Sequence, residues 1–421
     1  MQDRIKKCVD ALKTLACKTI NDCTMEKTTT YFGKEEQLKV LLPSGDEKYV
    51  SFWVRDAAMM AESGLISNDD LKRYIEIIAL KGQNGDSCRL LANGLTVPAY
   101  AVADHINYDG CPVFFPGTYN SGQDQGDGTF GSFPPFCDNY YFVLMVDAYL
   151  RQSSDYGILD VKYNGLLLLD RLEYAFAGYN IDEESGLCCS DAEKHTVDWG
   201  FVDTIKKSGK LLMASLLRYN AACALERIFE QRGDNAKRNY YFALTQKIRT
   251  NVLDVFYDAE TGWFYSATGI GHQHDVWATA YAVFSGIALD ERTLSALSNA
   301  YAGGKSVVDG YVRHILTDED FSDSSAWESA VSTHNEYQNG AYWATPTGWY
   351  AYALYKHSGS VELLEEFLCH TARNAHRGAP FEWMDEHTEQ ISGLNYGTSG
   401  VLPYIGAKRI LEETENRASL S

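Results

Sequence analysis

The feature that most constrains this chain is the alternation of apolar helical segments with loops rich in Gly, Trp, Tyr, Asp and His. In eight segments the apolar residues recur at helical spacing, whereas the strand-like alternation of apolar and polar residues is hard to find. The segments are 70–80, 140–151, 211–229, 240–257, 276–288, 349–355, 362–372 and 401–411. The sequence therefore predicts a mainly α-helical protein.

Six of the polar, aromatic loops lie at similar distances along the chain. The residues that mark them are Trp53, Asp124, Asp198, His272, Asn339 and Asn395, at intervals of 71, 74, 74, 67 and 56 residues. About 70 residues suits an antiparallel helix pair with one short and one long connection. Six such hairpins in a ring predict an all-α (α/α)6 barrel, with all six loops on one face. An open α-solenoid that binds a protein is the alternative.

The interior of the chain has no Pro/Ser-rich linker, so we expect one catalytic domain over residues 1–421, with residues 1–30 forming an N-terminal helix that packs on the barrel. No apolar stretch approaches the roughly 20 residues that span a bilayer, and the first residues indicate an amphipathic helix rather than a signal peptide. The ten cysteines include no C-x-x-C pair, which favours reduced thiols. We expect a soluble, cytoplasmic protein.

The charge of the chain argues against polyanionic partners. Lys and Arg total 37 against 57 Asp and Glu, a formal net charge of −20, which disfavours binding to nucleic acid or to an anionic membrane. Neither a dinucleotide-binding fingerprint nor a phosphate-binding loop occurs, so no cofactor is expected. The sequence His272-Gln273-His274-Asp275 is a weak zinc signal without further ligands, and we expect these histidines to form hydrogen bonds rather than to hold a metal.

The composition of the loops fits a sugar. Aromatic faces lie against the C–H faces of a sugar ring, while carboxylates, amides and imidazoles pair with its hydroxyls. The candidate substrate-binding residues are Trp53, Arg55, Asp56, Asp124, Trp199, His272, His274, Tyr337, Asn339, Trp343, Trp383 and Asn395. The predicted partner is an oligosaccharide or a glycoside; the oligomeric state stays open.

The loop of residues 195–203, HTVDWGFVD, offers a general acid. Such an acid is a carboxyl group that a semi-apolar setting keeps protonated near neutral pH. Asp198, flanked by Val197 and Trp199, is the first choice, and Asp203 is the second. Capping of the following turn, or sugar binding without proton transfer, is the alternative role for Asp198.

Two motifs resemble the six-hairpin glycosidase superfamily, in particular glucoamylase-type and α-L-rhamnosidase-type catalytic domains. The first is W-x-R-D-A-A at residues 53–58, and the second is the closing segment PFEWMD at 380–385 followed by SGLNYGTSG at 392–400. The resemblance implies that Arg55 and Asp56 bind the terminal sugar, although Asp56 is also suited to cap its helix. It further implies that Glu382 is the general base.

Residues 336–343, EYQNGAYW, resemble a loop that lines the sugar site in invertase-type and debranching-type members. Just ahead of this loop, Glu328 also follows a tryptophan and is the rival general base. The acid motifs of glucoamylases and rhamnosidases are absent, as is the β-sandwich that usually accompanies these catalytic domains.

The resemblance implies an inverting, exo-acting glycoside hydrolase that removes a terminal α-glucoside or α-L-rhamnoside. Inversion requires the two carboxyl groups to stand about 6.5–9.5 Å apart, which leaves room for a water molecule. Three alternatives stay open: a sugar epimerase that uses His195 and His274 as acid and base, an unsaturated uronyl hydrolase, and a non-catalytic carbohydrate-binding protein.

Overall fold

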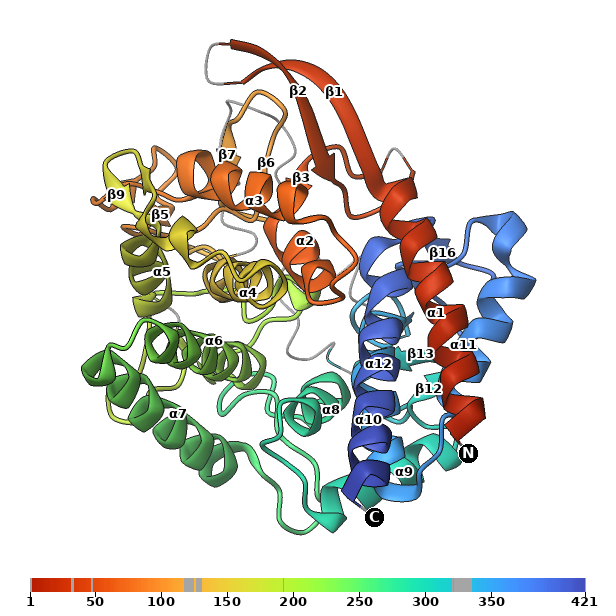
Figure 1. Cartoon of the computed structure of the whole chain (residues 1–421). Coiled ribbons are helices and arrows are strands. Elements are labelled where there is room, and N and C mark those ends of the chain that lie inside the picture. The colour runs from red at the N-terminus through yellow and green to blue at the C-terminus, as the bar shows by residue number, and fades with distance from the viewer. Residues whose placement is uncertain are drawn as a thin grey trace.

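In the computed structural model, two concentric rings of helices form an (α/α)6 barrel (Figure 1). The structure describes residues 2–31, 34–46, 48–116, 125, 131–191, 193–319, 321 and 335–420. Within these residues, the inner ring consists of α2 (Val54–Ala61), α4 (Phe136–Ser153), α6 (Leu212–Gln231), α8 (Val276–Phe284), α10 (Thr347–Ser358) and α12 (Gly397–Leu420). The outer ring consists of α1 (Gln2–Cys23), α3 (Asn68–Ile77), α5 (Leu168–Ala177), α7 (Asn235–Phe256), α9 (Glu291–Ala302) and α11 (Glu362–Arg373).

The two rings differ in how far their helices are buried. All eight residues of α2 and all nine of α8 are buried, because inner helices contact neighbours on every side. The outer helix α7 instead buries one stripe, made of Tyr241, Thr245, Ile248, Val252 and Phe256. Each inner helix packs against the next, and α12 packs against α2, so the ring is closed.

The first and the last helix of the chain pack against each other. The N-terminal helix α1 lies beside α12 and also contacts α11 (Figure 1). The sequence predicts one helix over residues 1–30, whereas α1 ends at Cys23 and a strand begins at Thr24.

Short strands occupy the connections. Strands β1 (Thr24–Tyr31) and β2 (Lys34–Leu41) form an antiparallel ribbon that extends from the barrel (Figure 1). A five-stranded antiparallel sheet runs in the order β12 (Val307–Val308), β13 (Tyr311–Arg313), β14 (Tyr342–Trp343), β15 (Trp383–Met384) and β16 (Ile391–Ser392). A three-stranded sheet has the order β3 (Phe52–Trp53), β6 (His105–Ile106) and β7 (Pro112–Val113). Three pairs complete the set: β4 (Arg89–Leu90) with β5 (Thr96–Val97), β8 (Lys162–Tyr163) with β9 (Leu166–Leu167), and β10 (Cys189–Ser190) with β11 (Gly209–Lys210).

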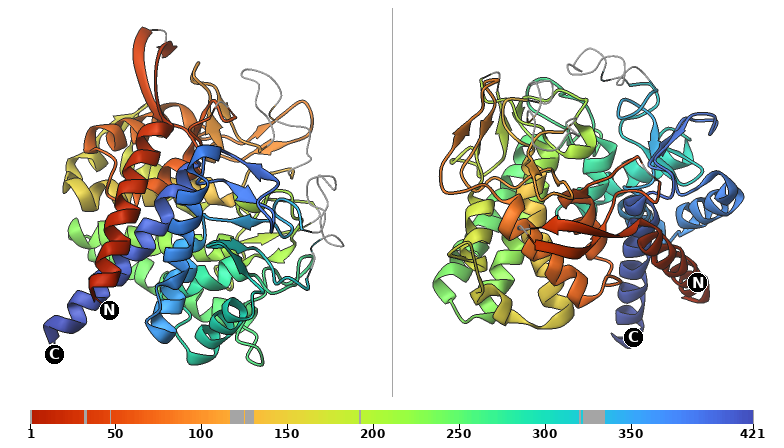
Figure 2. Two further views of the ribbon diagram at one scale, coloured as in Figure 1. Left: turned by 90° about the vertical axis from the view of Figure 1, so that its right-hand side faces the viewer. Right: turned by 90° about the horizontal axis from the view of Figure 1, so that it is seen from above.

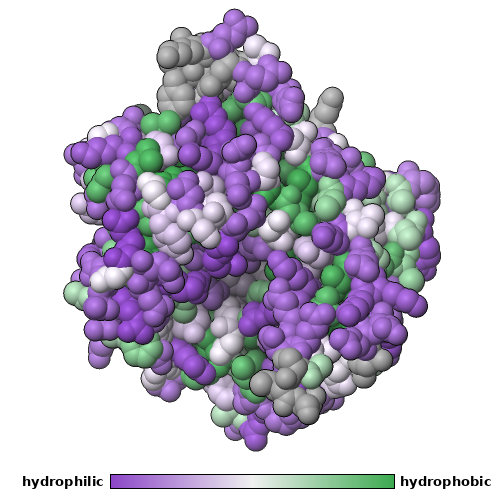
Figure 3. All heavy atoms as spheres, in the orientation of Figure 1, coloured by the Kyte–Doolittle hydropathy of each residue, from purple (hydrophilic) through white to green (hydrophobic). Residues whose placement is uncertain are grey.

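The prediction of an all-α barrel is confirmed, and each of the eight predicted helical segments overlaps a helix. Two outer helices, α5 and α9, and the strands are not among the predicted segments; most of the strands are two or three residues long, too short to carry a periodic signal. Hydrophilic residues cover most of the face seen in Figure 3, and the hydrophobic ones are scattered. No helix among the described residues is long and apolar enough to cross a membrane.

The inner helices α10 and α12 approach each other most closely at two glycines. A Cβ atom added to Gly348 would overlap the backbone carbonyl oxygen of Leu402, and one added to Gly406 would overlap the carbonyl oxygen of Gly348. Because backbone atoms cannot rotate away as a side chain can, the contact requires glycine on both helices.

We therefore expect Gly348→Ala to lower the free energy of unfolding by about 1–3 kcal/mol, the usual cost of overpacking. The helix propensity of alanine offsets at most about 1 kcal/mol of this loss. Denaturant unfolding measures the change. The control is Gly85→Ala, at an exposed position where an added Cβ meets no atom within 4 Å. Equal stability of the two variants would contradict the close helix contact.

Candidate active site

The loops that precede the inner helices gather at one end of the barrel, together with most of the short strands (Figure 2). There, residues from the loops before α2, α4, α6, α10 and α12, and from the first turn of α2, enclose a cavity. Its lining includes Tyr49, Trp53, Arg55, Asp56, Asp104, Phe201, Asp203, Tyr337, Glu382 and Tyr396. The cavity is thus built from segments that are up to 353 residues apart in the chain, from Pro43 to Tyr396.

The first turn of α2 brings Arg55 and Asp56 to the cavity, and both side chains are buried. The Nη1 atom of Arg55 donates to Asp104 Oδ1 at 2.9 Å, and its guanidinium lies over the ring of Phe201, 5.1 Å from the ring centroid. A Cβ atom on Gly200 would overlap this guanidinium, so glycine is needed there. Burial alone would raise the pKa of Asp104, but the charge of Arg55 and the hydrogen bond from His105 hold it below its ordinary value.

The carboxyl group of Asp56 is buried at the wall of the cavity. Its side chain is 2% exposed and accepts a hydrogen bond from the Tyr396 hydroxyl at 3.1 Å. Burial raises the pKa of Asp56 to about 7, despite the opposing charge of Arg55. The carboxyl group of Asp56 therefore gains and loses its proton near neutral pH.

Glu382 lies in the loop before α12, where its backbone N–H donates to the carbonyl oxygens of Ser392 and Gly393. Its side chain is buried, yet both carboxylate oxygens have strong donors: Lys48 Nζ is 2.8 Å from Oε2, and the Tyr49 hydroxyl is 2.7 Å from Oε1. These two hydrogen bonds fix the orientation of the carboxyl group at the cavity wall. A buried, oriented carboxyl group of this kind can serve as a general base.

Asp203 lines the cavity from the loop before α6 and is half-buried. Its Oδ1 atom accepts a hydrogen bond from Gln338 Nε2 at 2.6 Å. The other end of the Gln338 amide is fixed as well, because its Oε1 atom accepts from the backbone N–H and the hydroxyl of Thr204. The orientation of the Asp203 carboxyl is therefore set by the loop before α10.

Asp198, five residues earlier, is not among the residues that line the cavity. It is 3% exposed, its Oδ1 atom accepts from the Ala214 backbone N–H in the first turn of α6, and Lys207 Nζ lies 3.1 Å from its Oδ2 atom. Lys207 also contacts Asp275, which in turn pairs with His314 at 3.2 Å. Burial raises the pKa of Asp198 and Lys207 opposes this. These contacts are those of a helix cap within a buried ion network.

The other predicted tryptophans support the cavity in different ways. Trp53 lines it and stacks on His105, with ring centroids 4.4 Å apart. Trp199 is buried against Trp277 and Trp349 in the centre of the barrel. Trp343 and Trp383 are paired across β14 and β15, and both rings lie near that of Tyr337, which does line the cavity.

The remaining predicted residues lie elsewhere. Asn339 is buried and accepts from the Phe321 backbone N–H, and Asn395 donates to Asp22 of α1. The loop before α8 does not line the cavity: His272 contacts the carbonyl oxygen of Ala267, and His274 contacts Asp258. His195, whose pKa is lowered to about 4 by burial, is also absent from the lining. Asp124 and Glu328 lie outside the described residues.

Several residues of the site were not predicted, among them Lys48, Tyr49, Asp104, Gln338 and Tyr396. The sequence carries a signal for three of these, since Gln338 lies inside the predicted loop at 336–343, Tyr396 lies inside the motif at 392–400, and Tyr49 lies four residues before Trp53. Lys48 and Asp104 are polar residues without a recognisable motif, and only the folded chain brings them beside Glu382 and Arg55.

Neither protein-family profiles nor curated protein sequences match this chain. Solved structures do. A rhamnosidase from Klebsiella oxytoca with rhamnose bound aligns with a TM-score of 0.57 and 14% identity, over 97% of this chain and 64% of its own. A glucoamylase from Saccharomycopsis fibuligera aligns with a TM-score of 0.55 and 13% identity, over 89% of each chain. The chain has a six-hairpin glycosidase-type fold. A sugar epimerase from a ruminal bacterium is similar too, with a TM-score of 0.57 and 13% identity over 96% of this chain and 99% of its own.

The raised pKa of Asp56 predicts a pH-dependent stability. Between the ordinary carboxyl pKa of about 4 and the folded value of about 7, the native state holds a proton that the unfolded state has released, so stability falls as pH rises through this range. We expect Asp56→Asn to remove that fall, so that the stability of the variant relative to the wild type improves by about 2–4 kcal/mol from pH 4 to pH 8.

Urea unfolding at several pH values measures this difference. The matched control is Asp86→Asn, which changes an exposed aspartate. An Asp56→Asn difference that is the same at pH 4 and pH 8 would contradict a buried carboxyl group that titrates near neutral pH.

Proposed function

We propose that this protein is a glycoside hydrolase that acts on a terminal α-linked sugar, an α-glucoside or an α-L-rhamnoside, with inversion at the anomeric carbon. The observation that carries the proposal is the cavity that Glu382 and Asp203 share with Trp53, Arg55 and Asp56. The fold supports it, because a rhamnosidase and a glucoamylase have the same barrel. At such low identity the fold alone does not assign a substrate.

The proposed mechanism divides the chemistry between two carboxyl groups. Glu382, oriented by Lys48 and Tyr49, removes a proton from a water molecule that attacks the anomeric carbon. Asp203, oriented by Gln338, donates a proton to the leaving glycosidic oxygen. Arg55 and Asp56 bind hydroxyl groups of the terminal sugar, and Trp53 provides an aromatic face. Asp203 replaces Asp198 as the first choice of acid because only Asp203 lines the cavity.

Sugar epimerisation is the second candidate, favoured by the likeness to a sugar epimerase. Epimerisation by a histidine pair requires imidazoles that face the sugar. No histidine lines the cavity within the described part of the chain, and His274 is paired with Asp258. The paired carboxyl groups therefore favour hydrolysis.

The direct test is hydrolysis of aryl α-glucosides and aryl α-L-rhamnosides, with proton NMR of the first product formed. Release of one sugar with inverted anomeric configuration supports the proposal. Retained configuration would contradict the mechanism, and conversion of a free sugar into its epimer, without hydrolysis of either glycoside, would favour the second candidate.

Glu382→Gln is expected to lower kcat by at least about 10³-fold on every glycoside, because it removes the base that activates water while keeping the shape of the side chain. Steady-state kinetics measure the loss, and circular dichroism checks the fold. The matched control is Glu389→Gln, an exposed glutamate in the same loop. A rate within tenfold of the wild type would exclude Glu382 as the base.

Asp203→Asn is expected to discriminate between leaving groups. Aryl glycosides with a poor leaving group need a proton donor and should lose about 10²–10⁴-fold in kcat/KM, whereas glycosyl fluorides need little protonation and should lose far less. Asp198→Asn serves as the comparison: it should lower the unfolding midpoint by disturbing the contact with Lys207, without this dependence on the leaving group. The opposite pattern would return the acid role to Asp198.

A further inference from the structure

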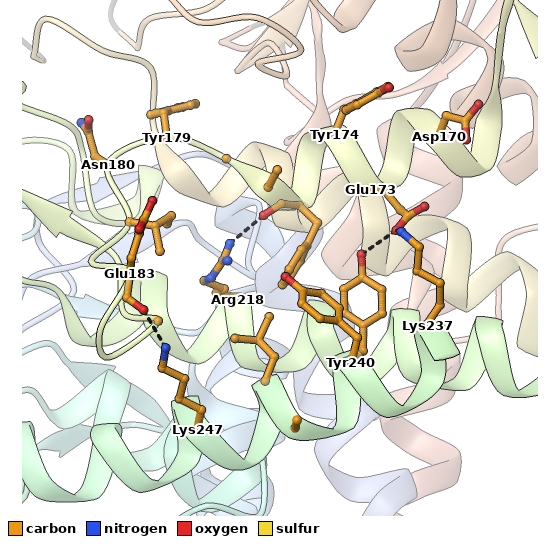
Figure 4. A pocket seen from close by; sticks show the side chains of 18 residues that line it. Asp170, Glu173, Tyr174, Tyr179, Asn180, Glu183, Arg218, Lys237, Tyr240 and Lys247 are labelled. Carbon is orange, nitrogen blue, oxygen red and sulfur yellow. Dashed lines mark hydrogen bonds and ion pairs between the residues drawn. The ribbon is translucent and has the colours of Figure 1, made fainter. Parts of the chain in front are cut away.

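A second and larger cavity lies on the outside of the barrel, between the outer helices α5 and α7. It has a volume of about 920 Å³ and shares no lining residue with the cavity that contains Glu382. Side chains of α5 and α7 and the loop after α5 form its walls, and Arg218 of α6 reaches it from the inner ring (Figure 4). Cavities of this size hold small organic ligands in other proteins.

Arg218 is 6% exposed, yet it uses little of its hydrogen-bonding capacity. Its Nη1 atom donates to the Phe176 carbonyl oxygen at 2.6 Å and to the Tyr140 hydroxyl at 3.4 Å. Among the described residues, its Nε and Nη2 atoms have no acceptor, and no carboxylate lies within ion-pair distance. Nε is itself buried from solvent, so Nη2 is the nitrogen that remains to bind an anion in the cavity by a charge-assisted hydrogen bond.

This lack of partners sets Arg218 apart from other buried arginines of the chain. Arg171 and Arg313 each donate from all three guanidinium nitrogens, mostly to backbone carbonyl oxygens. Arg55 has carboxylates of Asp56, Asp104 and Asp138 within 3.9 Å. Because a buried guanidinium with no carboxylate partner and two nitrogens without acceptors is costly, an arginine of this kind beside a cavity indicates a site for an anion.

The charges around the cavity favour a ligand with a single negative charge. The Oε1 atom of Glu173 already accepts two hydrogen bonds, from Lys237 Nζ at 2.5 Å and from the Tyr241 hydroxyl at 3.0 Å. Lys247 donates only to the backbone carbonyl oxygen of Glu183 among the described residues, so it adds a positive charge beside Arg218 (Figure 4). The carboxylates of Asp170 and Glu183 also line the cavity and would repel a phosphate dianion or a polyanion.

Aromatic side chains lie beside the guanidinium and along the cavity. The Phe176 ring is 4.3 Å from Arg218 Cζ, and the Tyr241 ring meets Phe176 edge to face at 5.4 Å. Tyr240, next to Tyr241, lines the cavity and is 58% exposed. Flat aromatic faces beside a positive charge suit a ring that carries a carboxylate, and the cavity is far larger than an inorganic anion needs.

We propose that the cavity between α5 and α7 binds a small organic monoanion, a six-membered ring bearing one carboxylate. The carboxylate binds Nη2 of Arg218, and the ring lies against Tyr240 and Tyr241. Aromatic acids and uronic acids share this chemistry. Binding there is separate from turnover at the cavity that contains Glu382, so it is measured without a glycoside.

The experiment is isothermal titration of the whole protein with benzoate and with D-glucuronate, each compared with its uncharged counterpart, benzamide or D-glucose. At least one acid should bind at least roughly tenfold more tightly than its counterpart, the effect of one charge-assisted contact. Binding of benzoate alone would identify the site as one for aromatic acids, and binding of glucuronate alone as one for uronic acids.

Three variants connect binding to the proposed contacts. Arg218→Gln should weaken the acid at least tenfold and leave the uncharged counterpart unchanged. Arg218→Lys keeps the positive charge and the fold but lacks the planar fork, so it should weaken the acid severalfold, and it carries the test if the Gln variant does not fold. Tyr240→Ala should weaken both acids, whereas Phe242→Ala, an exposed neighbour on α7 that does not line the cavity, should not.

Several results would overturn the proposal. It fails if neither acid binds at millimolar concentration, or if each acid binds no more tightly than its uncharged counterpart. It also fails if binding is unchanged in both Arg218 variants. Inorganic phosphate that binds as tightly as the acids, with no effect of Tyr240→Ala, would show a site for simple anions instead.

Discussion

The packing of six buried helices into a closed ring is the constraint on which the rest of this structure depends. Each inner helix packs against two others, and the contact of α12 with α2 closes the ring. The inner helices run in the same direction, so every loop that leads into one of them arrives at the same end of the barrel. The loops before five of these helices therefore meet in one cavity although they are far apart in the chain.

This end of the barrel also concentrates charge in a buried setting. Arg55 faces three carboxyl groups, those of Asp104 at 2.9 Å, Asp138 at 3.8 Å and Asp56 at 3.9 Å. One guanidinium cannot neutralise three buried carboxylates, so the three groups titrate differently: burial raises the pKa of Asp56 and Asp138, while Arg55 and His105 hold that of Asp104 low.

Two atoms of this cluster, Arg55 Nε and Asp138 Oδ1, are buried without a hydrogen-bond partner among the described residues. Leaving such groups unsatisfied costs free energy, and active sites are where structures tolerate that cost. The cluster thus keeps two unsatisfied buried polar atoms at the first turn of α2, beside the cavity.

The sequence predicts the barrel well and the site in part. Inner helices, which are buried all round, and outer helices, which bury one stripe, differ in sequence pattern. The motifs at residues 53–58 and 380–385 are recognised without knowledge of the fold, and four of their residues line the cavity: Trp53, Arg55, Asp56 and Glu382. The partners of Glu382 could not be predicted from the sequence, because Lys48 is 334 residues away in the chain and belongs to no motif. The aromatic residues were over-predicted: Trp199 and Trp343 are buried, and composition does not separate a tryptophan of the barrel centre from one that faces a ligand.

The choice between Asp198 and Asp203 shows where local reasoning ends. Both lie in the same loop, and the immediate sequence favours Asp198 because Val197 and Trp199 flank it. What separates them is Lys207, whose buried ammonium pairs with Asp198 and Asp275. A carboxyl group that pairs with a buried lysine and accepts from the first turn of α6 is held by the fold itself, away from the cavity. Asp203 lines the cavity, and an amide from another loop orients its carboxyl group.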